Sequence, residues 1–244
     1  MIDREFAVDG NPVVRISIRS GRVNVEEGDA GVVRLRVDSS DSHFELRQRV
    51  DAIEASGAGR TYVTVSLPPL GDVVIETSSG DITVAPRLAR LDAVTASGNV
   101  DFDSIERLRA KTASGRVRGN RVDGEASCVT ASGSIKIAQM TDRADLSTAS
   151  GDVTIGECAG ALHCATLSGN VKIEKVTGPF VKVKSMSGGV KLGIPPRTRL
   201  ELDAESLSGK VSLPDPSTRP EPPEREISVK VRLVSGDLKI ERVS

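Results

Sequence analysis

The sequence predicts an all-β protein, a single-stranded parallel β-solenoid with coils of about eighteen residues and two main strands in each coil. Three observations predict it. A Ser-Gly pair recurs nine times at steps of mostly 17 to 19 residues, apolar and polar residues alternate on both sides of each pair, and aromatic residues make up only 2% of the chain. With so few aromatic side chains the core must be narrow, and a stack of Val, Ile, Leu, Ala and Thr meets that requirement.

Residues 1–70 are expected to form an N-terminal capping β region that is continuous with the solenoid. They contain one related turn at Ser20-Gly21 and the strand-like runs VVRLRV and TYVTVSLP, whereas Ser56-Gly57 lacks the apolar pattern after it and is interpreted as a loop. A short helix is expected near 41–49. Because an exposed end coil invites edge-to-edge pairing, both termini should depart from the repeat.

Residues 71–213 are expected to form the regular solenoid repeats. Positions six and four before each serine, and three and five after it, are apolar, and Gly119 is the one exception in the last of these columns. Such alternation predicts two half-buried strands per repeat, stacked in parallel about 4.8 Å apart. The nine serines, the last of which follows the regular repeats, are Ser79, Ser97, Ser114, Ser132, Ser150, Ser168, Ser187, Ser208 and Ser235.

The Ser-Gly pair itself is predicted to be the tight corner between two strands. A tight corner needs a residue that adopts positive φ, which glycine does without a Cβ clash. The serine hydroxyl can hydrogen-bond to backbone groups at the same corner.

Residues 214–244 are predicted to hold a Pro-rich excursion and a C-terminal closing strand pair. The excursion, PDPSTRPEPPERE, spans 214–226, and proline cannot donate to a strand ladder. The final segment, ISVKVRLVSGDLKI, repeats the strand-corner-strand pattern. We expect it to close the stack.

These motifs resemble a bacterial "putative adhesin" family of unknown function, whose β-strand-repeat or Toastrack-like domains carry serial TASGDV-type motifs. The resemblance covers nearly the whole chain and includes YVTVSLPPLGDVVIETSSGDITV from Tyr62 to Val84 and the terminal VSGDLKI. It implies a β-solenoid with a role in adhesion or envelope-stress signalling, often beside membrane anchors. It supplies no catalytic residues.

Composition narrows the function classes. The net charge is -1, so nothing favours specific nucleic-acid binding, and no apolar run is long enough to span a membrane. The three cysteines are too few and too unevenly placed for a disulfide framework. A cytoplasmic protein is expected from the sequence as given, or an envelope or surface protein if a leader was removed.

Enzymatic chemistry is not expected, and no catalytic, metal or cofactor site is predicted. A nucleophilic serine needs a nearby base, and the chain has only His43 and His163, the latter in an outward polar column with no matching neighbour. Cys128 and Cys164 share an inward column two coils apart, which is too far for a disulfide, and Cys158 lies on the looser turn. The carboxylates near the corners are interpreted as solvated surface charge rather than as a glycosidase pair: Asp81, Asp101, Asp152 and Asp237.

Two surface features are candidates for a partner site. The residue before the serine is Leu167, Met186, Leu207 or Val234 in four late repeats, and it forms an apolar stripe if it faces outward. A twist of the chain at the corner would instead tuck these side chains inside. The second is an outward basic ladder of Arg118, Lys136, Lys172 and Lys191, interrupted by Thr154, which suits an anionic polymer or only keeps the strand face soluble.

A non-enzymatic interaction or scaffold module, adhesin-like and binding a protein or polymer partner, is therefore the leading hypothesis. A surface adhesin or envelope-stress component is the first alternative. The second is a scaffold that forms homo-oligomers by end or face stacking. A polysaccharide-active β-helix enzyme is the least favoured.

Overall fold

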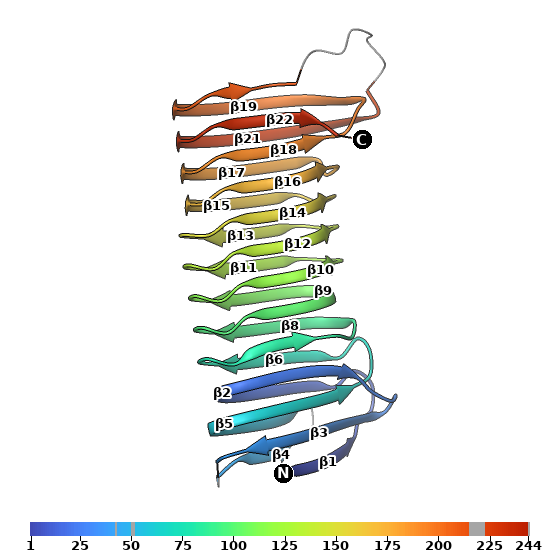
Figure 1. Ribbon diagram of the computed structural model, residues 1–244. Helices are drawn as coiled ribbons and strands as arrows, with labels where there is room; N and C mark the ends of the chain where they lie inside the picture. The colour runs from blue at the N-terminus through green and yellow to red at the C-terminus, as the bar shows by residue number, and fades with distance from the viewer. Residues whose placement is uncertain (42, 50–51, 215–222, 244) are drawn as a thin grey trace. The chain divides into compact units, whose positions relative to one another are not determined.

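The computed structural model describes residues 1–41, 43–49, 52–214 and 223–243, and these residues form strands and turns without a helix (Figure 1). Within these ranges, accordingly, there is no apolar helix of membrane-spanning length. The chain divides into two compact units, Met1–Asp123 and Gly124–Ser244. Each unit is a parallel β-solenoid, as the repeat predicted.

The first unit stacks its regular coils on a long strand near the N-terminus. Its strands are β1 (Ile2–Ala7), β2 (Val13–Glu27), β3 (Val32–Ser39), β4 (Glu45–Gln48), β5 (Ile53–Leu67), β6 (Asp72–Thr77), β7 (Asp81–Val84), β8 (Leu88–Thr95), β9 (Val100–Thr112) and β10 (Val117–Val122). The first half of β2 pairs in parallel with β6 and the second half with β7, so β2 forms the coil beneath the first regular repeat. Its other edge pairs in parallel with β5.

The N-terminal strands depart from the parallel pattern. β3 and β4 pair antiparallel with β5, and β1 pairs antiparallel with β3. The prediction of a short helix near 41–49 is wrong, because residues 45–48 are the strand β4; Ser42 lies outside the described residues. The Asp41 carboxylate accepts hydrogen bonds from the amides of His43 (2.9 Å) and Ala58 (2.6 Å), which lower its pKa and fix the turn before β4.

The second unit consists of shorter coils with two strands each. Its strands are β11 (Ala126–Thr130), β12 (Ile135–Met140), β13 (Ala144–Thr148), β14 (Val153–Cys158), β15 (Leu162–Ser168), β16 (Val171–Val176), β17 (Phe180–Ser187), β18 (Val190–Ile194), β19 (Thr198–Ser208), β20 (Val211–Ser212), β21 (Arg225–Ser235) and β22 (Leu238–Arg242). One parallel ladder joins β11, β13, β15 and β17, and the other joins β12, β14, β16 and β18.

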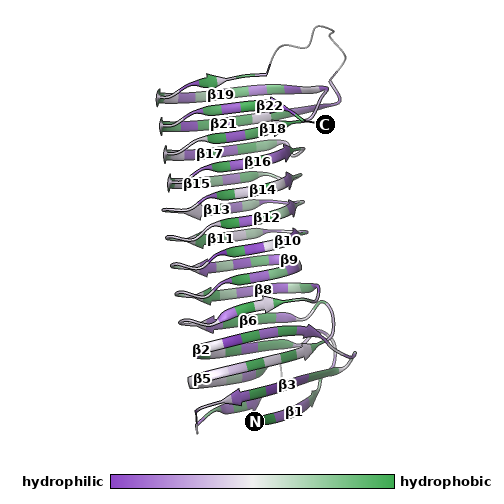
Figure 2. Cartoon of the chain, in the orientation of Figure 1, coloured by the Kyte–Doolittle hydropathy of each residue, from purple (hydrophilic) through white to green (hydrophobic). Residues whose placement is uncertain are grey.

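The predicted inward columns form the core of each unit. In the second unit Ile137 pairs with Ile155, Ile155 with Ile173 and Ile173 with Leu192, and all four side chains are fully buried. Figure 2 shows the result as hydrophobic and hydrophilic residues alternating along the strands. Burial of such columns against the next coil is what stabilises a solenoid.

The last strand pair does not close the stack, contrary to the prediction. β21 pairs in parallel with β17 on one side and with β19 on the other, and β22 likewise lies between β18 and β20. The C-terminal pair is therefore inserted between two coils that precede it in sequence. The Pro-rich excursion precedes this inserted pair in the chain, and its residues 215–222 lie outside the described ones.

The corner is held by the threonine two positions before the serine rather than by the serine hydroxyl. The Gly80, Gly98 and Gly115 amides each donate to the hydroxyl of the threonine three residues earlier, at 2.8 to 2.9 Å. Each threonine is buried, so its hydroxyl satisfies a backbone amide that the turn would otherwise leave unpaired.

The reason for glycine at the corner also differs from the prediction in most copies. Positive φ occurs at Gly21, Gly188, Gly209 and Gly236. At Gly98 the φ angle is not in that range, but a Cβ would lie 1.9 Å from the carbonyl oxygen of Gly80 in the coil below. Stacked corners touch through their backbones, and only glycine leaves room for that contact.

Candidate interaction surface

The four apolar residues before the corner serines form one exposed row. Ser168 pairs with Ser187, Ser187 with Ser235, and Ser235 with Ser208 in register, so the preceding residues are neighbours in the same order. Because of the inserted strand pair, that spatial order is Leu167, Met186, Val234 and Leu207. Their exposed fractions are 53%, 55%, 46% and 85%, so the chain does not tuck them inside.

This apolar row lines a groove of about 620 Å³ in the second unit. The groove is also lined by Lys184, Glu205 and Arg232, which lie two residues before Met186, Leu207 and Val234 on the same strands. A second groove of about 320 Å³ adjoins it, since both are lined by Ser147, Ala165 and Lys184. The surface is thus hollowed rather than flat over β13, β15 and β17.

Basic side chains on β17 and β21 flank the apolar row. In the parallel register Lys182 lies opposite Lys230, and Lys184 lies opposite Arg232. Arg232 is neutralised by Asp203 (2.9 Å) and Glu205 (3.1 Å) on β19. Among the residues that the structure describes, no carboxylate lies within ion-pair distance of Lys182, Lys184 or Lys230, although Asp203 is opposite Lys230 in the register. We call these three residues the lysine cluster.

His163 lies at the margin of this surface, and the prediction that it has no matching neighbour is wrong. Its Nδ1 is 3.1 Å from an Asp145 carboxylate oxygen, and its ring contacts the edge of Phe180 with centroids 5.6 Å apart. Both His163 and Asp145 line the smaller groove together with Lys182. The contacts orient the imidazole but bring no nucleophile to it, so the pair has the geometry of a surface hydrogen bond.

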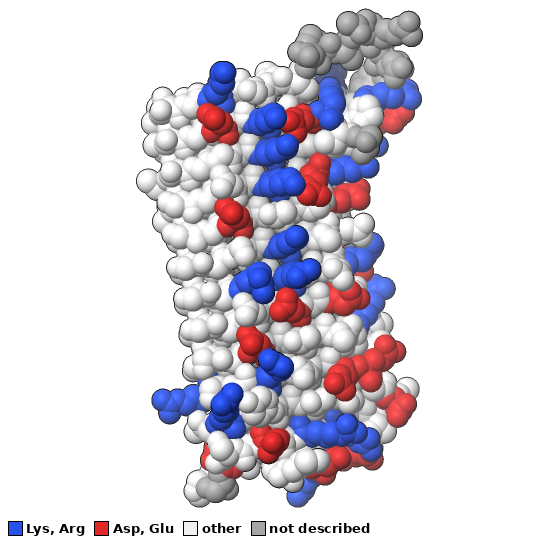
Figure 3. Space-filling model, viewed as in Figure 1, with Lys and Arg blue, Asp and Glu red and all other residues white. Residues whose placement is uncertain are grey.

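The predicted basic ladder is interrupted by charge pairing. Lys136, Thr154, Lys172 and Lys191 are in register within the second unit, and Lys239 follows Lys191. Lys172 pairs with Glu174 at 2.7 Å and Lys191 with Glu241 at 2.6 Å. Figure 3 shows one face of the molecule, on which basic side chains form a column and acidic side chains lie beside the upper part of that column.

Two further facts weaken this ladder as a polyanion site. Hydrogen bonds from Lys191 and Lys239 lower the pKa of Glu241 to about 2, so this carboxylate stays charged at every physiological pH. Arg118 belongs to the first unit, where it pairs in register with Asp101. Close glutamates therefore compete with an anionic polymer for Lys172, Lys191 and Lys239.

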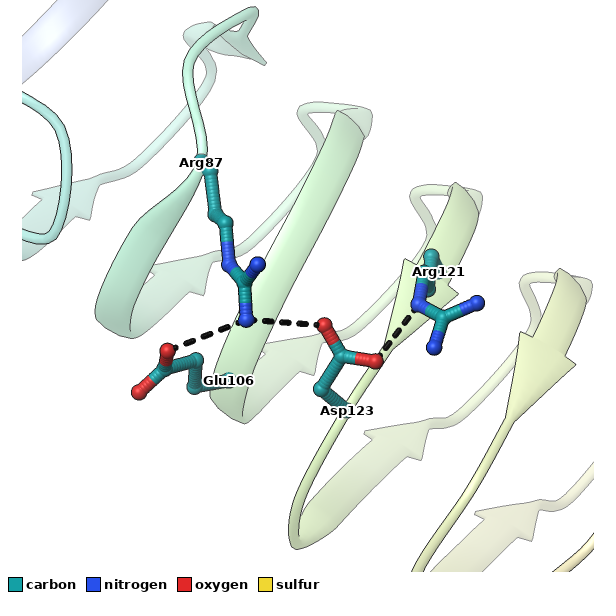
Figure 4. Close-up of polar contacts among 4 residues, drawn as sticks. All are labelled: Arg87, Glu106, Arg121 and Asp123. Atoms are coloured by element: carbon teal, nitrogen blue, oxygen red, sulfur yellow. Dashed lines mark hydrogen bonds and ion pairs between the residues drawn. The ribbon is translucent and has the colours of Figure 1, made fainter.

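A charge network in the first unit joins residues of three successive coils (Figure 4). The Arg87 guanidinium lies 3.2 Å from both Glu106 and Asp123, and Arg121 lies 2.5 Å from the other oxygen of Asp123. Each of the four residues forms an ion pair with at least one of the others. We interpret the network as structural because its charges are already paired.

Three of the four corner carboxylates also have a structural role, in addition to the predicted one of surface charge, and Asp101 is the exception. Asp81, Asp152 and Asp237 accept hydrogen bonds from the backbone amides of Asn99 (2.9 Å), Asn170 (2.8 Å) and Lys210 (2.8 Å) in the adjacent coil. The Asp or Asn that follows five of the nine Ser-Gly pairs, visible as SGD or SGN in the sequence, is the signal that could have predicted this role.

The cysteines all lie in the core of the second unit. Cys128 and Cys164 are separated by Leu146 in one inward column, as predicted. Cys158 is not on the looser turn but at the end of β14, buried between Met140 and Val176. Burial raises the pKa of Cys128 and Cys164 to about 12. Within the described ranges no group of three metal-ligating side chains occurs.

Comparison with known proteins gives one family. The profile of the family described as Toastrack DUF4097 matches residues 33–241. None of the curated proteins matches the sequence. Among solved structures, a protein from Bacteroides fragilis described as a "putative adhesin" is 14% identical, with 99% of this chain and 96% of that chain covered and a TM-score of 0.53. Another "putative adhesin", from Parabacteroides distasonis, is 15% identical over 99% and 96% of the chains, with a TM-score of 0.46. At this identity the first likeness shows the fold alone.

Proposed function

The chain belongs to the Toastrack DUF4097 family, and from that premise we propose that it is a non-enzymatic, adhesin-like module that binds a partner protein through the grooved surface of its second unit. The apolar row of Leu167, Met186, Val234 and Leu207 is the observation that carries the proposal. Four adjacent apolar side chains, each about half exposed or more, form a continuous patch on a rigid support. Patches of this kind favour partner binding.

The shape of the surface supports a protein partner. Protein interfaces bury an apolar centre and surround it with polar groups. The apolar row lines a groove of about 620 Å³ that also contains the charged ends of Lys184, Glu205 and Arg232. Stacked strands hold the row in place, so binding would cost little ordering of the surface itself.

A peptide selection tests the proposal. A random dodecapeptide library is selected on the full chain, and the enriched peptides are measured on Leu167→Ser/Met186→Ser and on the control Val94→Ser, an exposed apolar residue of the first unit. We expect the double variant to bind at least about tenfold more weakly, because apolar anchors dominate interface energies, and the control to bind normally. Equal affinity for all three proteins would contradict the proposed site.

Turnover of a polysaccharide or ester that one substitution abolishes would contradict the non-enzymatic role.

One observation favours a second function, self-assembly through the end coil. Val211 and Leu213, which follow β19, are 44% and 55% exposed, and within the described ranges β21 is the only strand paired with β19. An unpaired edge beside apolar side chains favours strand addition from another copy. Sedimentation velocity over a concentration series tests it. A sedimentation coefficient that grows with protein concentration, and that Leu213→Glu holds constant, supports end stacking.

Fractionation of native cells would separate the surface-adhesin form of the proposal from an intracellular one.

A further inference from the structure

We infer that the partner presents an acidic, extended segment to the grooved surface, with its carboxylates over Lys182, Lys184 and Lys230 and its apolar side chains on the apolar row. This inference rests on the proposed function and names the chemistry of the partner. It starts from the three lysines of the cluster, which lie side by side on β17 and β21.

The lysine cluster places like charges directly opposite one another. Lys182 pairs in register with Lys230, and Lys184 with Arg232. Like charges at directly opposite positions of neighbouring strands repel. Lys172 and Lys191, by contrast, each have a glutamate at ion-pair distance. An anionic partner would remove this repulsion, and its binding would be favoured for that reason.

The lysine cluster is continuous with the apolar row. Lys184 lies on the same strand as Met186, and both line the larger groove, while Lys182 and Lys184 line the smaller one. A ligand that fills both grooves therefore contacts apolar and cationic side chains together. An extended peptide supplies apolar and acidic side chains at that close spacing.

The acidic residues on β19 limit the length of the segment. Asp203 and Glu205 lie opposite Lys230 and Arg232 and bind the Arg232 guanidinium. A carboxylate beyond Arg232 would meet these two acids. The anionic part of the partner therefore lies over β17 and β21, and its apolar part extends along the row.

A nucleic acid or a lipid surface fits the same residues less well. Single-stranded nucleic acids bind through aromatic stacking along a basic track, whereas the cluster holds three lysines and the two grooves are lined without a Phe, Tyr or Trp. A bilayer favours protruding apolar side chains, and here the row borders a groove.

The test uses the selected dodecapeptides and a charge-reversed variant. We expect the enriched peptides to be rich in Asp and Glu. Their affinity for the unmodified chain should fall with added salt, and at low salt it should be at least about tenfold lower on Lys184→Glu/Lys230→Glu. The matched control, Lys111→Glu/Lys136→Glu, makes the same change in net charge at two exposed lysines outside the grooves and should bind as the unmodified chain does. Thermal unfolding of both variants checks that they remain folded.

The outcomes separate this inference from the proposed function. Peptides that depend on Leu167 and Met186 but are neutral or basic would leave the proposed function standing and overturn the acidic partner. A library that enriches no peptide would contradict both. Vesicles of phosphatidylcholine and phosphatidylserine serve as a third probe; lysine-dependent sedimentation with them, without acidic peptides, would replace the protein segment by a lipid surface and overturn the inference.

Discussion

The ring of Phe102 occupies the place that a side chain at Gly119 would need. The two residues are opposite each other on β9 and β10, and a Cβ at Gly119 would lie 2.0 Å from the ring Cζ. This explains the one gap in the apolar column five residues after each serine. A large residue in one coil is accommodated by the absence of a side chain in the next.

We predict that Phe102 and Gly119 are energetically coupled. Gly119→Val alone should destabilise the chain by about 3 kcal/mol through overpacking, and Phe102→Val alone by about 2 kcal/mol through the cavity it leaves. The double variant restores a column of branched residues and should cost less than either change alone. Urea unfolding of the three variants measures this, and additive losses would show that the two sites are independent.

The neighbouring glycines Gly188 and Gly189 should respond very differently to alanine. Gly188 has a φ of 129°, and its Cβ would lie 2.2 Å from the carbonyl oxygen of Gly169. Around Gly189 the nearest atom to a Cβ is 3.5 Å away. We expect Gly188→Ala to cost more than about 2 kcal/mol and Gly189→Ala to stay within about 0.5 kcal/mol of the unmodified chain. Thermal melts of the two proteins compare them directly, and similar melting temperatures would contradict the stacked-corner explanation.

Thr112 and Thr166 occupy equivalent corner positions but differ in hydrogen bonding. The Thr112 hydroxyl accepts from the Gly115 amide at 2.8 Å, whereas the buried Thr166 hydroxyl has no hydrogen-bond partner among the residues that the structure describes. Thr112→Val should therefore cost about 1–3 kcal/mol by leaving a buried amide unpaired, and Thr166→Val should be neutral or stabilising. Chemical denaturation measures both. Equal losses would mean that the hydroxyl does not hold the corner.

The buried thiols predict a loss of stability in alkali. An ordinary thiol has a pKa near 9, and burial raises that of Cys128 and Cys164 to about 12. Between these values the unfolded chain loses the proton first, so the contribution to stability is complete below pH 9 and disappears as the pH rises toward 12. Each thiol should lower the free energy of unfolding by about 1.4 kcal/mol per pH unit in that range.

Comparison with Cys128→Ala/Cys164→Ala isolates the thiol effect from other alkaline titrations. The variant starts less stable at neutral pH but should lose stability less steeply above pH 9. Parallel pH profiles for the two proteins would show that the thiols do not contribute. In the native chain the same burial should make all three cysteines slow to react with maleimides.

Much of the fold could be predicted from the sequence because every coil of a solenoid repeats the same pattern of apolar, polar and turn residues. Period-two alternation around each Ser-Gly pair predicts which residues face inward, and the structure buries them in the regular coils. Val211 and Leu213 of the end coil belong to the same columns but are exposed. The order of the last coils could not be predicted in this way. β17, β19 and β21 carry nearly the same strand pattern, so the pattern alone does not say which of them are neighbours.

The candidate surface was predictable only in part, for the same reason. The apolar row was found as a column in the repeat, but its exposure depends on the local path of the corner. Lysines with and without a carboxylate at ion-pair distance could not be distinguished, because Lys191 meets Glu241 only when β22 lies beside β18. The lysine cluster on β17 and β21 likewise exists only because these two strands are adjacent.

The insertion of β21 and β22 between earlier coils has a consequence for synthesis on the ribosome. Domains begin to fold from the N-terminus as the chain emerges, and each regular coil can dock on its predecessor at once. β19 cannot, because its neighbour β21 is translated after it. While the C-terminal residues are still inside the exit tunnel, β19 lacks its native neighbour, and the apolar row and the lysine cluster are completed only after β21 emerges.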